Sequence, residues 1–128
     1  MINDSLNLKG RVALELKDAE GNVKEVREID NLVVDAGLDY IASRMEGVTE
    51  AVMSHMGLGS GSTAADAADT DLETLLGSRE ALDSTTVTDN TVVYVATFEA
   101  GDATGSVREA GIFNASTSGT MLCRTVFD

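Results

Sequence analysis

His55 and Cys123 are the single histidine and the single cysteine of this chain, and their side chains are the ones best suited to nucleophilic or metal chemistry. His55 lies between Met53 and Met56 in a strand-like segment, where a hydrogen-bonded structural histidine is far commoner than a catalytic base. Cys123 lies in a second strand-like segment and is expected to be a small buried apolar residue. One histidine and one cysteine cannot supply the usual ligands of a transition-metal site, so we expect neither enzymatic activity nor a cofactor.

A glycine-rich segment, Gly57-Leu-Gly-Ser-Gly-Ser62, has some likeness to a phosphate-binding loop. The dinucleotide fingerprint requires glycine at the position of Ser62, and the nucleoside triphosphate loop requires Lys followed by Ser or Thr. Neither requirement is met. We therefore interpret the segment as a flexible exit from a strand into a loop.

Four carboxylates follow, and carboxylate oxygens are the ligands that calcium prefers. Asp66, Asp69, Asp71 and Glu73 do not have the Asp-x-Asp-x-Asp-Gly spacing of the calcium loop. A solvated acidic loop is the main interpretation, with calcium left as an alternative. A long loop of small and acidic residues usually binds something, and the residues we expect near a contact are Gly57, Gly59, Gly61, Thr63, Asp66, Asp69 and Asp71.

The composition limits the partners. The 128 residues carry a net charge of −13 and are 43% hydrophobic, which predicts one globular domain over residues 1–128. A field of that sign repels phosphate backbones and anionic lipids, so we expect no nucleic acid and no membrane as partners. The amino terminus has neither the charged nor the apolar region of a signal peptide, so assembly in a bacterial cytoplasm is expected.

The first half of the chain predicts two strands and a helix. Apolar and polar residues alternate from Leu6 to Leu16, which is typical of a half-buried strand, and Val23 to Ile29 reads as a charged return strand at an edge. A helix is expected from Asp35, its N-cap, to Met45, with Gly47 as the residue that ends it. Its apolar stripe is formed by Leu38, Ile41, Ala42 and Met45. Further on, a strand over 52–58 and a short helix over 72–76 are expected on either side of the acidic loop.

Two β-hairpins are expected in the last third of the chain. The first joins 81–88 to 91–98 through Asp89-Asn90, and the second joins 106–113 to 120–127 through a loop from Asn114 to Gly119. A six-residue loop places Glu109 directly opposite Arg124, either as an ordinary cross-strand ion pair or as part of a subunit interface. The predicted fold class is α+β and β-rich, a mainly antiparallel β-sandwich or barrel-like sheet with one packed α-helix.

Short motifs occur in a fixed order between Asn31 and Phe127. They are Asn31-Leu-Val-Val-Asp-Ala-Gly-Leu-Asp-Tyr-Ile-Ala-Ser-Arg-Met45, Met56-Gly-Leu-Gly-Ser-Gly-Ser-Thr-Ala-Ala65, Asp69-Thr-Asp-Leu72, Ser78-Arg79, Glu109-Ala-Gly-Ile-Phe-Asn114 and Gly119-Thr-Met-Leu-Cys-Arg-Thr-Val-Phe127. This pattern resembles a family of small virion proteins of tailed bacteriophages, described as tail-fibre or tail-collar-like. Members typically carry an N-x-V-x-x-A-G helix start, a G-x-G-x-T loop and an E-x-G-[IL]-F strand.

The resemblance implies a noncatalytic structural protein of the virion, in the tail, neck or fibre, that assembles as a symmetric oligomer. It would contact further copies of itself, with a trimer as one arrangement, and other virion proteins. A capsid decoration protein of the phage head is the alternative, and a stand-alone module that binds a host glycan is the alternative from another class. No proline guards the strand edges. We therefore expect an interface at the second hairpin, formed by Glu109, Phe113, Met121, Arg124 and Phe127.

Overall fold

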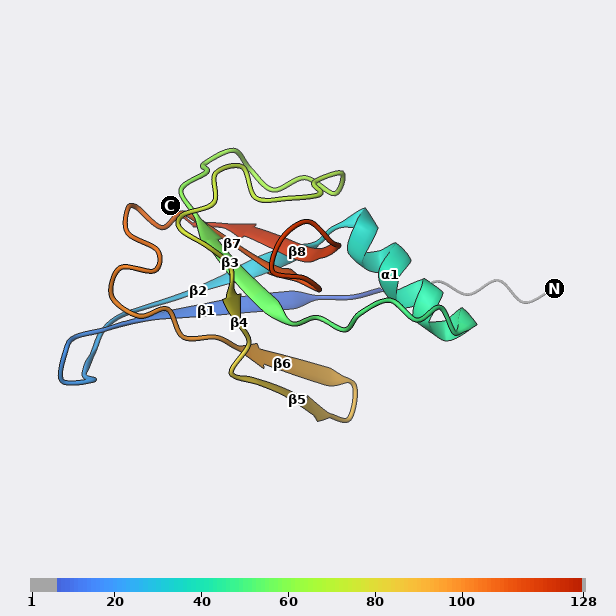
Figure 1. Cartoon of the computed structure of the whole chain (residues 1–128), viewed down its shortest axis with the longest axis horizontal. Helices are drawn as coiled ribbons and strands as arrows, with labels where there is room; N and C mark the ends of the chain where they lie inside the picture. Colours follow the sequence, from blue (N-terminus) through green and yellow to red (C-terminus); the bar gives the residue numbers. More distant parts are fainter. Residues whose placement is uncertain (1–6, 128) are drawn as a thin grey trace.

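The computed structural model describes residues 7–127 and contains a curled six-stranded antiparallel sheet, a separate two-stranded hairpin and one helix (Figure 1). The strands are β1 (Gly10–Lys17), β2 (Val23–Val33), β3 (His55–Gly59), β4 (Glu80–Ala81), β5 (Ser84–Thr88), β6 (Thr91–Val95), β7 (Glu109–Phe113) and β8 (Met121–Val126), and the helix is α1 (Asp35–Glu46). The large sheet has the order β1-β2-β8-β7-β3-β4, and β5 and β6 form the small sheet. The β-rich α+β fold predicted from the sequence is confirmed.

The first two strands form a long ribbon, as their alternating pattern predicts. Its turn is held by Asp18, whose carboxylate accepts the backbone N–H groups of Glu20 and Asn22 at 3.0 and 2.9 Å. Val12 and Leu14 point inward and pack against the core cluster around Leu58. The predicted start at Leu6 lies outside the described residues. The segment predicted as an edge, Val23 to Ile29, pairs with β1 alone among the described strands, and β2 pairs with β8 only at its end, through Leu32 and Val33.

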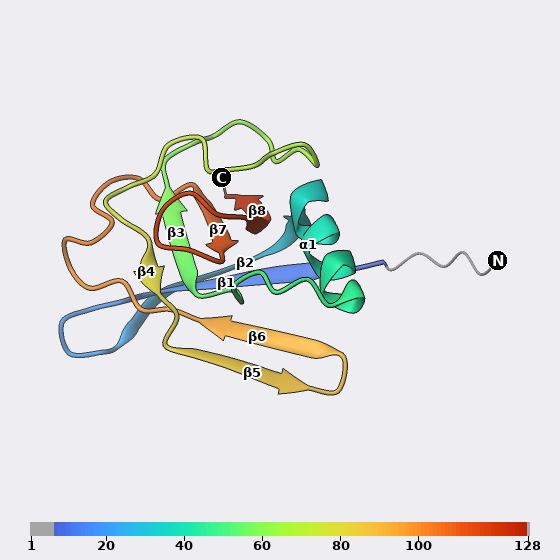
Figure 2. The same cartoon turned by 45° about the vertical axis from the view of Figure 1, so that its right-hand side comes forward.

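Helix α1 stands at one end of the large sheet, as both views show (Figures 1 and 2). Asp35 is its first residue and Val34 its N-cap, so the predicted cap is displaced by one residue. Gly47 ends the helix with a φ of 92°, as predicted. The predicted stripe is wrong in its second half, since Met45 is 84% exposed. The reason is that α1 touches the sheet near its start, where Gly37 lies against the carbonyl of Leu122 and the far end of the helix projects beyond the sheet.

The segment between β3 and β4 differs from its prediction. It forms no helix over 72–76 and instead returns alongside β3. Ser60 donates its N–H to the carbonyl of Thr74, and Leu76 donates to that of Leu58, both at 2.9 Å. A strand-like return is favoured here because it pairs backbone groups at the end of β3 and places Leu72 in the core with Phe113.

The two hairpins of the last third are present but shorter than predicted. The turn Asp89-Asn90 joins β5 to β6, whereas Ala81 belongs to β4 and residues 96–98 follow the strand. The second hairpin is formed by β7 and β8. All five residues of β7 are buried.

Candidate functional site

The strand register of the second hairpin differs from the prediction by two residues. Glu109 lies opposite Val126 and Gly111 lies opposite Arg124. A bulge between Ile112 and Phe113 and a longer loop produce the shift. A shift of two keeps each side chain on its original face, so Glu109 and Arg124 still meet, as diagonal neighbours. The Nε atom of Arg124 donates to Oε2 of Glu109 at 2.9 Å.

The Glu109 carboxylate is fully buried and accepts four hydrogen bonds. Oε1 accepts the backbone N–H groups of Gly61 at 3.0 Å and Thr74 at 2.8 Å. Oε2 accepts the N–H of Glu73 at 3.0 Å in addition to the Arg124 guanidinium. A single side chain therefore holds both branches of the 60–76 loop against the sheet.

Arg124 holds the same loop at its far end. Its Nη1 donates to Asp69 Oδ2 at 2.8 Å and its Nη2 to the carbonyl oxygen of Thr63 at 3.0 Å. The Glu73 carboxylate lies 3.7 Å from Nη2. The guanidinium side chain is only 3% exposed, so these contacts compensate for the loss of its hydration. We call Glu109, Arg124, Asp69 and Glu73 the charge cluster.

The buried carboxylate of Glu109 and the half-buried carboxylate of Asp69 are both stabilised in the charged form. Burial alone raises the pKa of Glu109, but the N–H donors of Thr74, Glu73 and Gly61 and the Arg124 guanidinium outweigh it and lower the pKa. For Asp69 burial again raises the pKa, and the N–H of Asp66 together with Arg124 reverses the effect. The charge cluster is thus a set of fixed charges that hold the loop.

The glycine-rich segment is a packing device. A Cβ atom at Gly59 or Gly61 would collide with the Glu109 side chain, and one at Gly57 would press on Leu72 at 3.1 Å. Glycine at these alternate positions lets the loop backbone reach the buried carboxylate. The interpretation of this segment as a flexible exit is therefore wrong for its backbone. The N–H groups of Ser60 and Gly61 donate to Thr74 and Glu109, and the carbonyl groups of Leu58 and Gly59 accept hydrogen bonds from Leu76 and Arg108.

Arg79 forms a second buried cation site that the sequence did not reveal. It lies 3.5 Å above the Phe113 ring, measured from its guanidinium carbon to the ring centroid. Its Nη1 donates to the carbonyl oxygens of Ala115 at 3.0 Å and Ser118 at 2.7 Å, and Asp71 lies 3.3 Å from its Nη2. Arg79 therefore holds the β7–β8 loop. A lone arginine outside any periodic pattern gives no sequence signal for this role.

The five residues expected at a subunit interface are enclosed by their own chain. Their exposed fractions are 0% for Glu109, Phe113 and Met121, 2% for Arg124 and 4% for Phe127. They build the interior of the chain, because the loop and the sheet cover them. Among the expected loop contacts, the three glycines are buried, Asp69 is half-buried, and Thr63, Asp66 and Asp71 are exposed.

The carboxylates considered for calcium are occupied by protein donors. Asp69 accepts from Arg124 and from the backbone N–H of Asp66, and the Asp66 carboxylate accepts the N–H of Ala68 at 2.8 Å. Glu73 accepts the N–H of Thr63. Within residues 7–127 no three His, Cys, Asp or Glu side chains converge in a way that could hold a metal.

His55 lies away from the charge cluster, at the opposite end of β3 from Gly59, and Cys123 directly precedes Arg124 in β8 with its side chain on the opposite face of the strand. His55 is half-buried at the start of β3, with its Nδ1 atom 2.8 Å from the Ser54 hydroxyl. Cys123 is 5% exposed in β8, and burial raises the pKa of its thiol to about 11. Cys123 is therefore a small buried residue, as predicted.

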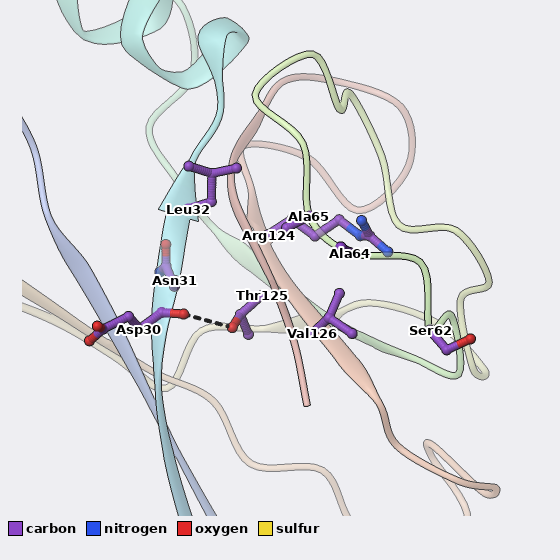
Figure 3. Close-up of a pocket in the computed structure, with 9 residues that line it drawn as sticks. All are labelled: Asp30, Asn31, Leu32, Ser62, Ala64, Ala65, Arg124, Thr125 and Val126. Carbon is purple, nitrogen blue, oxygen red and sulfur yellow. Dashed lines mark hydrogen bonds between the residues drawn. The ribbon is translucent and has the colours of Figure 1, made fainter. Parts of the chain in front are cut away.

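A shallow pocket of about 330 Å³ is lined by residues 30–32 of β2, residues 124–126 of β8 and residues 62, 64 and 65 of the loop (Figure 3). The strands β2 and β8 pair only at Leu32–Arg124 and Val33–Cys123, and they separate toward Asp30. In this gap Thr125 donates its hydroxyl to the Asp30 carbonyl at 3.2 Å. The Asn31 side-chain oxygen is buried here, and it has no hydrogen-bond partner within the described part of the chain. Arg124 also lines the pocket, but its donors are directed at the charge cluster.

Comparisons with protein families, curated proteins and solved structures found no match to this chain. Among residues 7–127 no helix is long and apolar enough to cross a membrane. The site is therefore interpreted from its own geometry, which fixes loops to a sheet through two buried arginines.

Proposed function

We propose that this protein is a noncatalytic structural component of a tailed bacteriophage particle, a compact tail, neck or fibre module that works as a symmetric oligomer. The observation that carries the proposal is the position of the motif residues. The glycines of the G-x-G-x-T motif lie against Glu109, the first residue of the E-x-G-[IL]-F motif. The motifs thus come together as a packing framework, which is what a structural protein requires of them.

The polar interior supports the same proposal. The polar groups of Glu109, Arg124 and Arg79 bind backbone groups or oppositely charged side chains of their own chain. A catalytic acid or nucleophile has to reach a substrate, and these groups are occupied. Their arrangement gives long loops a fixed shape, and a fixed surface loop suits a protein that must fit its neighbours in a particle.

The aromatic residues disfavour the glycan-binding alternative. Glycan sites commonly present an exposed aromatic face. The two tyrosines, Tyr40 and Tyr94, are half-buried against the cluster around Met53, and Tyr40 donates its hydroxyl to the Ala51 carbonyl at 3.0 Å. Of the three phenylalanines, two are buried and Phe98 is half-buried.

The test is the protein composition of purified particles. Particles from a lysate of the bacterium that carries this gene are banded on a density gradient and digested with trypsin. Isotope-labelled peptides covering 80–108 and 109–124 then give the copy number per particle. We expect both peptides in the particle band at a few to a few dozen copies. Their absence from intact particles, with the protein free in the lysate, would overturn the proposal, and hundreds of copies would favour decoration of the head or of the tail tube instead.

A further inference from the structure

The β5–β6 hairpin is an arm with unpartnered apolar residues on both faces. Val87 pairs with Val92 on one face, and Val93 and Val95 lie on the other, because side chains alternate along a strand. Their exposed fractions are between 45% and 67%. Tyr94 is the only residue of the two strands that is even half-buried, and it anchors the arm to the body. An isolated two-stranded hairpin is marginally stable in water, so this arm gains from a further contact.

The outer edge of the arm is open and lacks protection against pairing. Strand β5 pairs only with β6 among the described strands, and it is the strand farther from the body in both views (Figures 1 and 2). All five of its residues are exposed. Neither strand contains a proline, a charged side chain or a bulge, the features by which natural edge strands avoid pairing.

The charge distribution indicates which partner suits this edge. The chain carries a net charge of −13, so two copies repel each other over most of their surface. Residues 84–98 contain one charged side chain, Asp89, which lies in the turn. The five residues of β5 are uncharged, and Asp83 and Asp89 lie just beyond its two ends. An arm that extends from the body lets two copies touch along this uncharged strand and keeps the acidic bodies apart.

We propose that β5 pairs in antiparallel fashion with β5 of a second copy of this chain, which gives a four-stranded sheet, β6-β5-β5-β6, across a two-fold axis. Only a two-fold axis through Thr86, the middle residue of β5, pairs all five residues of this strand with those of the second copy. Thr86 then meets its own copy, and Thr85 meets Val87. This inference rests on the proposed function as an oligomer and names its contact, at a place other than the buried β7–β8 hairpin.

Cysteine crosslinking tests the register directly. Residues directly opposite in an antiparallel pair have Cα atoms about 4.5 to 5.5 Å apart, within the range that a disulfide spans. Thr86→Cys should therefore form a covalent dimer under mild oxidation, whereas Thr117→Cys, at an exposed position of the β7–β8 loop, should stay monomeric on a denaturing gel. The native Cys123 is buried and serves as the internal background. Failure of Thr86→Cys to form the covalent dimer would overturn the pairing.

Sedimentation analysis tests whether the arm carries the association. The full chain, 13.4 kDa, should sediment as a dimer at high concentration. Thr86→Lys places two like charges opposite each other and should shift the equilibrium several-fold toward monomer. Thr117→Lys makes the same change of net charge and should leave the dimer intact.

Comparison of the two lysine variants distinguishes a failure of the β5 pairing from a failure of the proposed oligomer. If Thr86→Lys and Thr117→Lys both remain oligomers like the parent, association uses another surface, and this inference fails while the proposed oligomer stands. If the parent chain is a monomer at every concentration, the β5 pairing also fails. The presence of the protein in particles is measured separately and decides the proposed structural function alone.

Discussion

Replacing Glu109 by Gln changes only one atom group of the side chain, but we expect it to lower the free energy of unfolding strongly. The carboxylate receives four donors, two on each oxygen. A carboxamide keeps one acceptor oxygen and turns an NH₂ group toward two of those donors. Breaking a buried ion pair by removing one partner costs about 3–5 kcal/mol. Arg124 keeps Asp69 as a second partner, so we expect a loss of about 3 kcal/mol, the lower end of that range.

Urea denaturation followed by circular dichroism measures this loss. The midpoint should fall and the slope should stay the same, because the surface exposed on unfolding hardly changes. Hydrogen exchange adds a local measurement, since those of the amides of Gly61, Glu73 and Thr74 that face the new NH₂ group lose their acceptor and should exchange faster. Glu73→Gln is the matched control. Its side chain is 43% exposed and 3.7 Å from Arg124, so the loss should be below about 1 kcal/mol.

Equal losses for Glu109→Gln and Glu73→Gln would refute the reasoning, as would unchanged exchange at the three amides. If Glu109→Gln is unfolded at room temperature, an acid titration of the natural chain tests the same contacts. The pKa values of Glu109 and Asp69 are both lowered in the fold. A lowered pKa contributes stability above the ordinary carboxyl pKa, and this stability is lost as the pH falls through the folded value. The unfolding free energy should therefore decline below about pH 4, and a flat profile there would contradict the proposed contacts.

Three further predictions concern other contacts. Arg79→Lys should lower the unfolding free energy by about 1–3 kcal/mol in urea titrations, because lysine cannot stack on Phe113 and also bind two carbonyls; an unchanged midpoint would count against this role. Gly37→Ala should lower the melting temperature although alanine favours helices, since its Cβ would collide with the Leu122 carbonyl, and a rise would show that the contact relaxes easily. Cys123 should react with a thiol reagent at pH 8 only after unfolding in guanidinium, because it is buried and the pKa of its thiol is about 11; rapid labelling of the folded chain would contradict that burial.

The sequence predicted the elements whose signals are local. The alternation in β1, the turn Asp89-Asn90 and the helix end at Gly47 depend on residues within a few positions of each other. The prediction of a buried apolar stripe on the helix was wrong in its second half, because burial of the stripe depends on where α1 contacts β8. That contact is set by Gly37, the one residue of the helix that is fully buried. A pattern of apolar residues does not show a close approach made through a glycine.

The predicted register of the second hairpin was wrong for a related reason, because it depends on a contact with a segment distant in the sequence. The bulge leaves Leu122 as an extra residue in β8, and its carbonyl accepts the N–H of Val34 at 3.2 Å, just before α1. The pairing of the second hairpin therefore depends on a contact with a distant segment. The ion pair between Glu109 and Arg124 was still predicted, because a shift of two residues preserves the face and a long arginine reaches the diagonal position.

The acidic loop shows how composition can mislead about order. Small and acidic residues suggest a mobile segment, but order depends here on single buried acceptors rather than on apolar area. Gly57, Gly59 and Gly61 recur at every second residue, the period of one face of a strand. Glycine at every second residue indicates that a side chain or a backbone segment packs closely against this face of the strand. In the structure Leu72 and the Glu109 carboxylate occupy that space, so the period-two glycines were the sequence signal for the close approach of this segment to Glu109.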